Sequence, residues 1–131
     1  MQFMSNEWAE AYTEAWNNDD IITKKLKRFS SFFKYSISDR DDIAPLVIKI
    51  ENGFCTSYGE EDAFDKKDIE YNISANEESW KNVFDEKTGK KEVMNIKGFD
   101  FKGPKLKALS NKSGLTRGVE LMAQMQGVTL S

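Results

Sequence analysis

Residues 45–58, PLVIKIENGFCTSY, constrain the fold more than any other stretch because they have the pattern of a β-hairpin. From Leu46 to Glu51, and again from Phe54 to Tyr58, side chains alternate with the two-residue period of a strand. Between these runs stands Asn52-Gly53, a pair that tolerates the positive φ angles of a tight hairpin turn. An isolated hairpin is marginally stable in water, so the rest of the chain must supply further strands or helices.

Three further segments alternate in the same way and are predicted as strands: Phe33–Ile37, Ile69–Ile73 and Met94–Lys97. A polar turn over residues 38–42 and an acidic loop over residues 59–68 separate two of them from the hairpin. The sequence therefore predicts five strands that are mostly consecutive and antiparallel.

Two amphipathic helices are predicted before the strands. In the first, residues 5–17, aromatic side chains recur every four positions on one face: Trp8, Tyr12 and Trp16. Ser5 or Asn6 can cap the first helix, and Asp20 is the expected cap of the second. The second helix places its apolar side chains on one face: Ile22, Leu26 and Phe29.

Three more helices are predicted in the second half of the chain. A capping box, Ser74-Ala-Asn-Glu77, opens a short helix that Gly89 can close, with an apolar face of Trp80, Val83 and Phe84. Pro104 fits the first turn of another short helix, which carries Leu106 and Leu109. The last helix, Leu115–Gln126, has an apolar stripe formed by Leu115, Val119 and Met122.

This order of elements predicts an α+β fold in which helices cover one face of the sheet. A length of 131 residues corresponds to one domain, residues 1–131, with one hydrophobic core.

Several classes of function lack the residues they need. The chain has no histidine, which removes the commonest general base at neutral pH and the usual zinc ligand. Its lone cysteine, Cys55, excludes an intrachain disulfide and fits a buried apolar role better than a nucleophile. The net charge of −3 argues against a nucleic-acid partner. We see no signal peptide and no apolar run that could span a bilayer, so we expect a cytoplasmic location.

What remains is a surplus of large apolar side chains, including three tryptophans, nine phenylalanines and five methionines. Each of them individually is best interpreted as core. Methionine also fits an adaptable apolar wall, because its thioether fills irregular space.

One segment, IAPLVIKIENGFCTSYGEEDAFDKKDIEYNISANEESWKNVF, resembles the sterol carrier protein type 2 (SCP-2-like) family. Within the resemblance, Ile69–Ser74 matches a strand of the family and Asn76–Phe84 its short helix. Met94-Asn-Ile-Lys-Gly98 matches a later strand and Lys105–Leu109 a leucine-rich helix, with residues 99–104 as an insertion between them. The similarity covers roughly Ile22 to Leu109.

The resemblance implies a five-stranded, mainly antiparallel sheet with helices on one face and an apolar tunnel between the two layers. That tunnel would hold a fatty acid, fatty acyl-CoA, sterol or other lipid. By position, its walls would come from Leu46, Ile48, Phe54, Tyr71, Trp80, Met94 and Leu106. The last helix would close one end with Leu115, Val119 and Met122.

The sequence therefore predicts a lipid-binding or lipid-transfer domain without catalytic residues, metal or cofactor. An accessory or protein-interaction module that presents a hydrophobic substrate to a partner enzyme is the alternative. Among the tryptophans, we expect Trp80 near the ligand and Trp8 or Trp16 in helix packing.

Two features keep two interpretations each. The clusters Lys24–Arg28 and Lys102–Lys107 are either solvated surface or contacts for an anionic headgroup or the phosphates of CoA. Besides a lipid or acyl-CoA ligand, the expected partners include a transient contact with a membrane surface, which the sequence assigns to no residue. The last helix is either a movable lid or a fixed cap on the core. Gly114, Gly118 and Gly127 lie in and beside it and favour the lid, because glycine destabilises a helix.

Overall fold

The computed structural model describes residues 1–84 and 98–131 of the chain. The helices and strands of these residues follow in chain order: α1 (Asn6–Asn17), α2 (Asp20–Lys25), β1 (Ser31–Ile37), β2 (Leu46–Glu51), β3 (Phe54–Glu60), the 3-10 turns η1 (Glu61–Ala63) and η2 (Lys66–Asp68), β4 (Tyr71–Ala75), α3 (Glu77–Phe84), β5 (Asp100–Lys102), α4 (Lys105–Ser110) and α5 (Lys112–Gln124).

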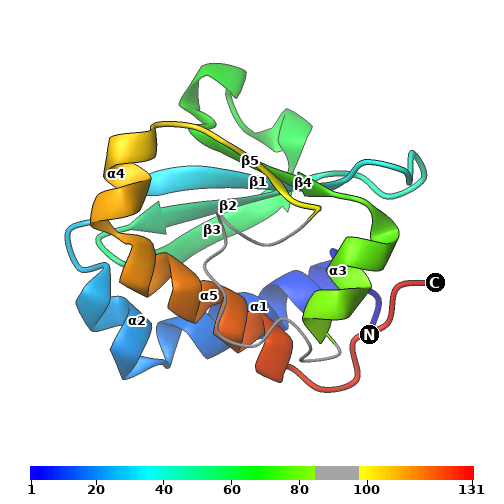
Figure 1. Cartoon of the computed structure of the whole chain (residues 1–131), viewed down its shortest axis with the longest axis horizontal. Helices are drawn as coiled ribbons and strands as arrows, with labels where there is room; N and C mark the ends of the chain where they lie inside the picture. The colour runs from blue at the N-terminus through cyan, green and yellow to red at the C-terminus, as the bar shows by residue number, and fades with distance from the viewer. Residues whose placement is uncertain (85–97) are drawn as a thin grey trace.

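The strands form one five-stranded sheet in the order β3-β2-β1-β4-β5 (Figure 1). β2 pairs antiparallel with β1 and β3, and β5 pairs antiparallel with β4. β1 and β4, in contrast, run parallel, with Phe33 opposite Tyr71 and Tyr35 opposite Ile73. The prediction of an α+β fold with a five-stranded, mainly antiparallel sheet is confirmed.

The predicted hairpin joins β2 to β3 through Asn52 and Gly53, which have φ angles of 48° and 87°. Gly53 is buried, and a Cβ there would lie 2.9 Å from the carbonyl oxygens of Thr23 and Leu26. Its carbonyl oxygen accepts a 2.8 Å hydrogen bond from the indole Nε1 of Trp16. The turn therefore needs glycine both for its conformation and for the close approach of α1 and α2.

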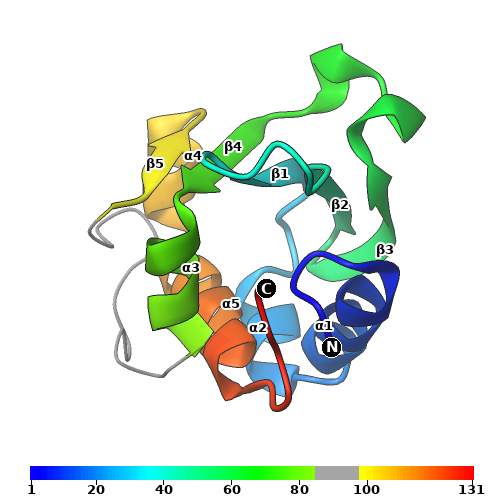
Figure 2. The ribbon, with the colours of Figure 1, turned by 90° about the vertical axis from the view of Figure 1, so that its right-hand side faces the viewer.

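The sheet arches over the helices, which fill its concave side (Figure 2). Along β1, Ser31, Phe33, Tyr35 and Ile37 are buried, whereas the residues between them are half-buried on the other face. That outer face is partly covered by η1 and by Phe64, which follows it. The Phe32 and Phe64 rings lie 6.0 Å apart, and Lys34 forms an ion pair with Glu61 of η1.

The two ends of the described chain lie side by side (Figure 1). Gln2 and Thr129 form a parallel β-bridge, and the Phe3 amide donates a 2.7 Å hydrogen bond to the Thr129 carbonyl. Phe3 and Leu130 are both buried in the core. The C-terminal segment is thereby held against the start of the chain.

Two predicted caps were wrong by one or two residues. Asp19, not Asp20, caps α2, because its carboxylate accepts the Ile22 amide at 2.9 Å. Ser74 belongs to β4, and Asn76 accepts the Ser79 amide of α3 at 2.8 Å. Phe29 lies beyond the end of α2, although it is buried as expected.

The edge strand β5 occupies residues that the sequence analysis placed in an insertion. The strand predicted over Met94–Lys97 and the helix end predicted at Gly89 lie outside the described residues.

Candidate functional site

An apolar cavity lies between the sheet and the helices. Its lining comes from α1, β1, β4, α3, the approach to β5 and α5: Tyr12, Trp16, Phe33, Tyr35, Ile73, Trp80, Val83, Phe99, Leu115, Gly118, Val119 and Met122. The cavity volume is about 20 Å³, enough for one water molecule. None of the described residues that line it carries a charged side chain.

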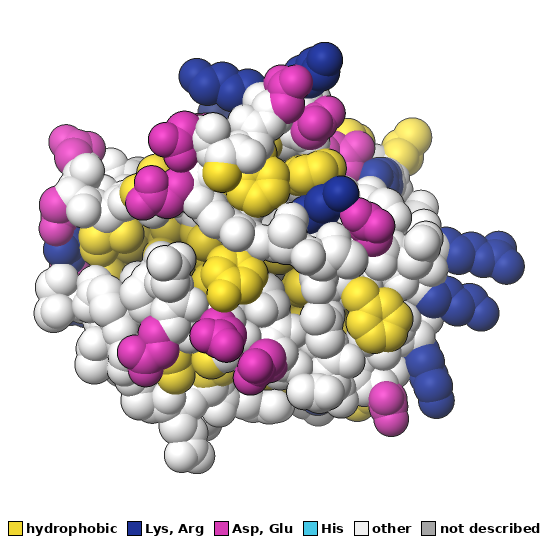
Figure 3. Space-filling model, turned by 180° about the vertical axis from the view of Figure 1, so that it is seen from behind, with side chains coloured by type: hydrophobic (Ala, Val, Ile, Leu, Met, Phe, Trp, Pro, Cys, Tyr) yellow, Lys and Arg dark blue, Asp and Glu magenta, His cyan; other side chains and the backbone are white. Residues whose placement is uncertain are grey.

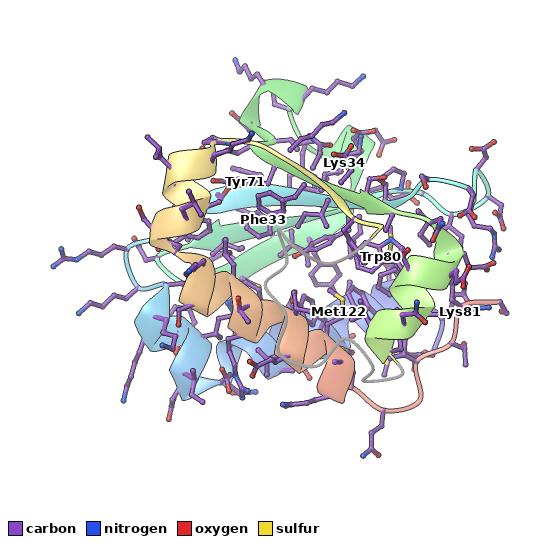
Figure 4. All side chains as sticks on the ribbon, viewed as in Figure 1. Phe33, Lys34, Tyr71, Trp80, Lys81 and Met122 are labelled. Carbon is purple, nitrogen blue, oxygen red and sulfur yellow. The ribbon has the colours of Figure 1, made fainter. Side chains whose placement is uncertain are left out.

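Trp80 forms the wall of the cavity at α3. Its indole Nε1 donates a 3.0 Å hydrogen bond to the Ser36 carbonyl, and its ring lies 4.7 Å from that of Phe99. In Figure 4, Trp80, Phe33 and Met122 project into the space between the sheet and α5, whereas Lys81 points outward from α3. The orientation of Trp80 is therefore set by a backbone bond on β1 and by aromatic packing.

Two tyrosines bring hydroxyl groups to this apolar region. The Tyr12 hydroxyl donates a 2.9 Å hydrogen bond to the Gly118 carbonyl of α5. Burial raises the pKa of Tyr12 and of Tyr35 well above the ordinary value for tyrosine. Burial also raises the pKa of the Cys55 thiol to about 12. All three groups are therefore protonated and neutral at neutral pH.

Helix α5 forms the floor of the cavity and packs tightly on its neighbours. A Cβ on Gly114 would overlap the Leu26 side chain, and one on Gly118 would lie 3.2 Å from the Trp16 ring. The guanidinium of Arg117, from the same helix, donates two hydrogen bonds of 2.7 and 3.0 Å to the Asp19 carboxylate. These glycines allow close helix packing, which favours the fixed-cap interpretation of this helix over the lid.

Four of the predicted site residues line the cavity: Trp80, Leu115, Val119 and Met122. Three others, Leu46, Ile48 and Tyr71, are buried in the core but are not part of the lining. Tyr71 instead donates a 2.7 Å hydrogen bond from its hydroxyl to the Pro104 carbonyl. Met94 lies outside the described residues.

The structure contradicts the placement of Phe54 and Leu106 in the cavity wall. Their exposed fractions are 46% and 81%, and neither contacts the cavity. Phe54 begins edge strand β3 on the side away from the core, and Leu106 points outward from α4 because the buried residue of that short helix is Ala108.

The remaining lining residues are not among the site residues predicted from the sequence. Trp16 was expected only in helix packing, yet its ring forms part of the cavity wall, whereas Trp8 stacks on Tyr12 as a packing residue. The signal was present in the alternation of Phe33 and Tyr35 and in the aromatic stripe of α1.

Neither a metal site nor a membrane span is found in the described parts of the chain. No group of three histidine, cysteine, aspartate or glutamate residues among them could hold a metal ion. No helix among them is both long and apolar enough to cross a bilayer.

The sheet order, the parallel β1–β4 pair and the helices on one face define an SCP-2-like fold. The crystal structure of sterol carrier protein 2 matches with a TM-score of 0.77 at 14% identity, over 94% of this chain and 98% of that one. The solution structure of a conserved hypothetical protein from Thermus thermophilus, described as possibly a sterol carrier protein, matches with a TM-score of 0.70 at 14% identity. That match covers 97% of this chain and 94% of the Thermus thermophilus chain.

A third solved structure, the UbiJ-SCP2 ubiquinone synthesis protein, matches with a TM-score of 0.51 at 8% identity. The match covers 83% of this chain and 90% of that one. At these identities the likeness establishes the fold alone. No protein-family model and no curated protein matches the chain.

Proposed function

We propose that this chain, as a single domain over residues 1–131, binds or transfers a lipid without catalysing a reaction on it. The observation that carries the proposal is the apolar cavity between the sheet and the helices of an SCP-2-like fold. A lining of aromatic and aliphatic side chains with a few hydroxyl groups is typical of sites for largely apolar ligands. Removing an alkyl chain from water contributes about 25 cal/mol per Å² of buried apolar surface.

The cavity must widen to accept such a ligand. Pockets for small molecules hold roughly 300–1,000 Å³, far more than the volume of about 20 Å³ seen here. We therefore infer that the ligand binds to an opened state, and the free energy of opening lowers the apparent affinity. Met122 is well suited to move aside, because methionine adapts its shape at small cost.

The proposal places the alkyl or ring part of the lipid inside and any charged headgroup at the surface. An ionised carboxylate would lose several kcal/mol of solvation within a lining whose described residues offer it no cation. Fatty acid, sterol and acyl-CoA all satisfy this condition if their charged groups stay outside. We also propose that the protein is located in the cytoplasm and makes a transient contact with a membrane surface.

A non-catalytic role is supported by the state of the groups beside the cavity. Tyr12, Tyr35 and Cys55 have raised pKa values, so none is a ready base or nucleophile at neutral pH. The alternative function, presentation of a hydrophobic substrate to a partner enzyme, uses the same cavity. The likeness to the UbiJ-SCP2 ubiquinone synthesis protein is compatible with it.

A matched pair of substitutions on α5 tests the proposal. Val119 and Leu121 have the same exposed fraction of 7%, but only Val119 lines the cavity. Val119→Phe fills the cavity and should weaken binding of a fluorescent fatty acid about tenfold or more, whereas Leu121→Phe should bind like wild type. Circular dichroism checks that both variants are folded. Equal affinities for the two folded variants would place the ligand elsewhere.

A further inference from the structure

One end of the molecule gathers cations and exposed apolar side chains, and we call it the basic end. Its cations are Lys24, Lys25, Lys27, Arg28 and Lys105, all exposed. Its apolar members are the four large hydrophobic side chains that the described residues expose: Ile21, Phe54, Leu106 and Leu109, at 48%, 46%, 81% and 53%. Because the whole chain carries a net charge of −3, the rest of the chain is more acidic than this end.

Contacts between elements make the basic end one continuous surface. The Nζ of Lys107, from α4, donates a 2.7 Å hydrogen bond to the Ser30 carbonyl and lies 5.1 Å from the centre of the Phe29 ring. Phe29 and Ser30 directly follow Lys27 and Arg28 in the chain, so α4 lies close to these cations. The Gly53 amide donates a 3.0 Å hydrogen bond to the Phe29 carbonyl, which brings Phe54 to the same end. Ile21 and Lys25 line a surface hollow with residues of α5 between Lys112 and Glu120.

The cations of the basic end are available to a partner. Within the described residues, Lys24, Lys25, Lys27, Arg28 and Lys105 form no ion pair. Among the carboxylates nearby, Glu70 is paired with Lys107, whereas Asp19 and Glu120 share the single charge of Arg117 and so leave one negative charge on this group. Asp20 is the exposed acid of α2 that opposes this charge.

Figure 3 shows several Lys and Arg side chains projecting from the right-hand edge of the molecule, while most of the visible Asp and Glu side chains lie in groups away from that edge. That edge is the side of α2 and α4, seen at the left of Figure 1. The molecule therefore presents opposite charge characters at different parts of its surface.

We propose that the basic end docks on an anionic lipid bilayer, with Leu106 and Leu109 inserted at the headgroup boundary and the surrounding cations on lipid phosphates. Aliphatic side chains beside lysines are the pattern of interfacial membrane contacts, in which apolar burial and attraction to anionic lipids add together. A nucleic acid would use the cations but would leave the leucines exposed to water, so the bilayer accounts for more of the surface.

The inference deepens the proposed function by assigning its membrane contact to a surface. The docked orientation would bring α4 and the first turn of α5 to the bilayer. Leu115 follows that turn and lines the cavity, so the membrane contact would lie next to one end of the binding site.

Vesicle sedimentation tests the inference. We expect the full chain to bind phosphatidylcholine vesicles that contain phosphatidylserine, to bind pure phosphatidylcholine weakly, and to be released by salt. Each cation near the surface strengthens binding about fivefold, so Lys27→Glu with Arg28→Glu should weaken it by about 25-fold or more. The control is Lys66→Glu with Lys67→Glu, the same charge change on η2, which should bind like wild type.

The apolar part has its own variant. Leu106→Gln with Leu109→Gln keeps helix-forming residues on α4, removes no buried side chain, and should weaken vesicle binding about tenfold. Circular dichroism checks the fold of each variant. Val119→Phe should sediment like wild type, which separates a failure of docking from a failure of cavity binding.

Three results would overturn the inference. The first is vesicle binding that falls equally for the Lys27/Arg28 variant and the Lys66/Lys67 variant. The second is vesicle binding that is unchanged by the leucine substitutions. The third is tighter binding to double-stranded DNA, measured by fluorescence polarisation, than to the anionic vesicles, which would assign the basic end to a nucleic acid.

Discussion

At the scale of single residues, two tryptophans should report ligand entry and a third should not. Trp80 and Trp16 line the cavity, whereas Trp8 is fully buried between Phe3 and Tyr12 and lies outside the lining. A fatty acid brominated along its alkyl chain quenches indole emission at short range. We expect this quenching to fall by about half in Trp80→Phe and in Trp16→Phe if the two cavity rings contribute equally, and to persist in Trp8→Phe. Undiminished quenching in both cavity variants would contradict the assigned site.

A second residue-scale prediction concerns the ion pair between Asp19 and Arg117, at 2.7 Å. The hydrogen bonds from Arg117 lower the pKa of Asp19 below 3.8 in the folded state. Because the folded pKa is the lower one, the pair contributes stability above pH 3.8, and the contribution is lost as the pH falls through the folded pKa. Asp19→Asn keeps a capping oxygen for α2 but removes the charge.

At neutral pH we expect Asp19→Asn to lower the free energy of unfolding by about 1 kcal/mol, measured by urea denaturation. The difference from wild type should shrink as the pH is lowered below 3.8. Asp41→Asn, which changes an exposed aspartate without an ion pair among the described residues, should have little effect at either pH. A difference for Asp19→Asn that stays constant with pH would show that charge is not its cause.

At the scale of elements, α5 is predicted to be a fixed part of the core. It buries Gly114, Leu115, Gly118, Val119, Leu121, Met122 and Ala123, and it packs on α1, α2, α3 and α4. Deleting residues 114–131 would expose this face to water and would also remove the bridge between Gln2 and Thr129. We expect the truncated chain to lose its cooperative thermal transition by circular dichroism. A truncated chain that melts cooperatively but binds fatty acid weakly would instead support the lid.

Comparing the elements shows which parts of the fold can be predicted from the sequence. Asn52-Gly53 and the alternation on either side of it predicted the β2–β3 hairpin correctly, because a tight turn and a two-residue period are local properties. Strand β5 was not predicted, since Asp-Phe-Lys is three residues long and only its central side chain is even half-buried. It exists through its pairing with β4, which is a long-range contact.

The candidate site was predictable only in part for a related reason. The stripe of Leu115, Val119 and Met122 defines the inner face of α5 from its own spacing. Which strand residues meet that stripe depends on register, however, and the parallel pairing sets Phe33 and Tyr35 beside Tyr71 and Ile73. Leu106 shows the opposite error, because a leucine in a short helix was interpreted as buried when Ala108 faces the core.

At the scale of the whole molecule, the core is densely filled, whereas the proposed lipid binding requires space inside it. One cluster of buried side chains extends from Phe3 to Leu130 and includes residues of both layers. The cavity within it has room for about one water molecule, so the proposed lipid needs a wider space than the described side chains leave. A ligand that binds only the opened native state should also raise its stability by mass action.

Native mass spectrometry tests the central claim most directly, namely that this fold holds one lipid in its cavity. The full chain, purified without detergent and incubated with a panel of fatty acids, sterols and acyl-CoA, is ionised gently and its mass compared with that of the 15.0 kDa polypeptide. The account predicts a complex with a single lipid for wild type and for Leu121→Phe, and a much smaller fraction of complex for Val119→Phe. Bare polypeptide under every condition, or a complex equally abundant in Val119→Phe, would contradict it.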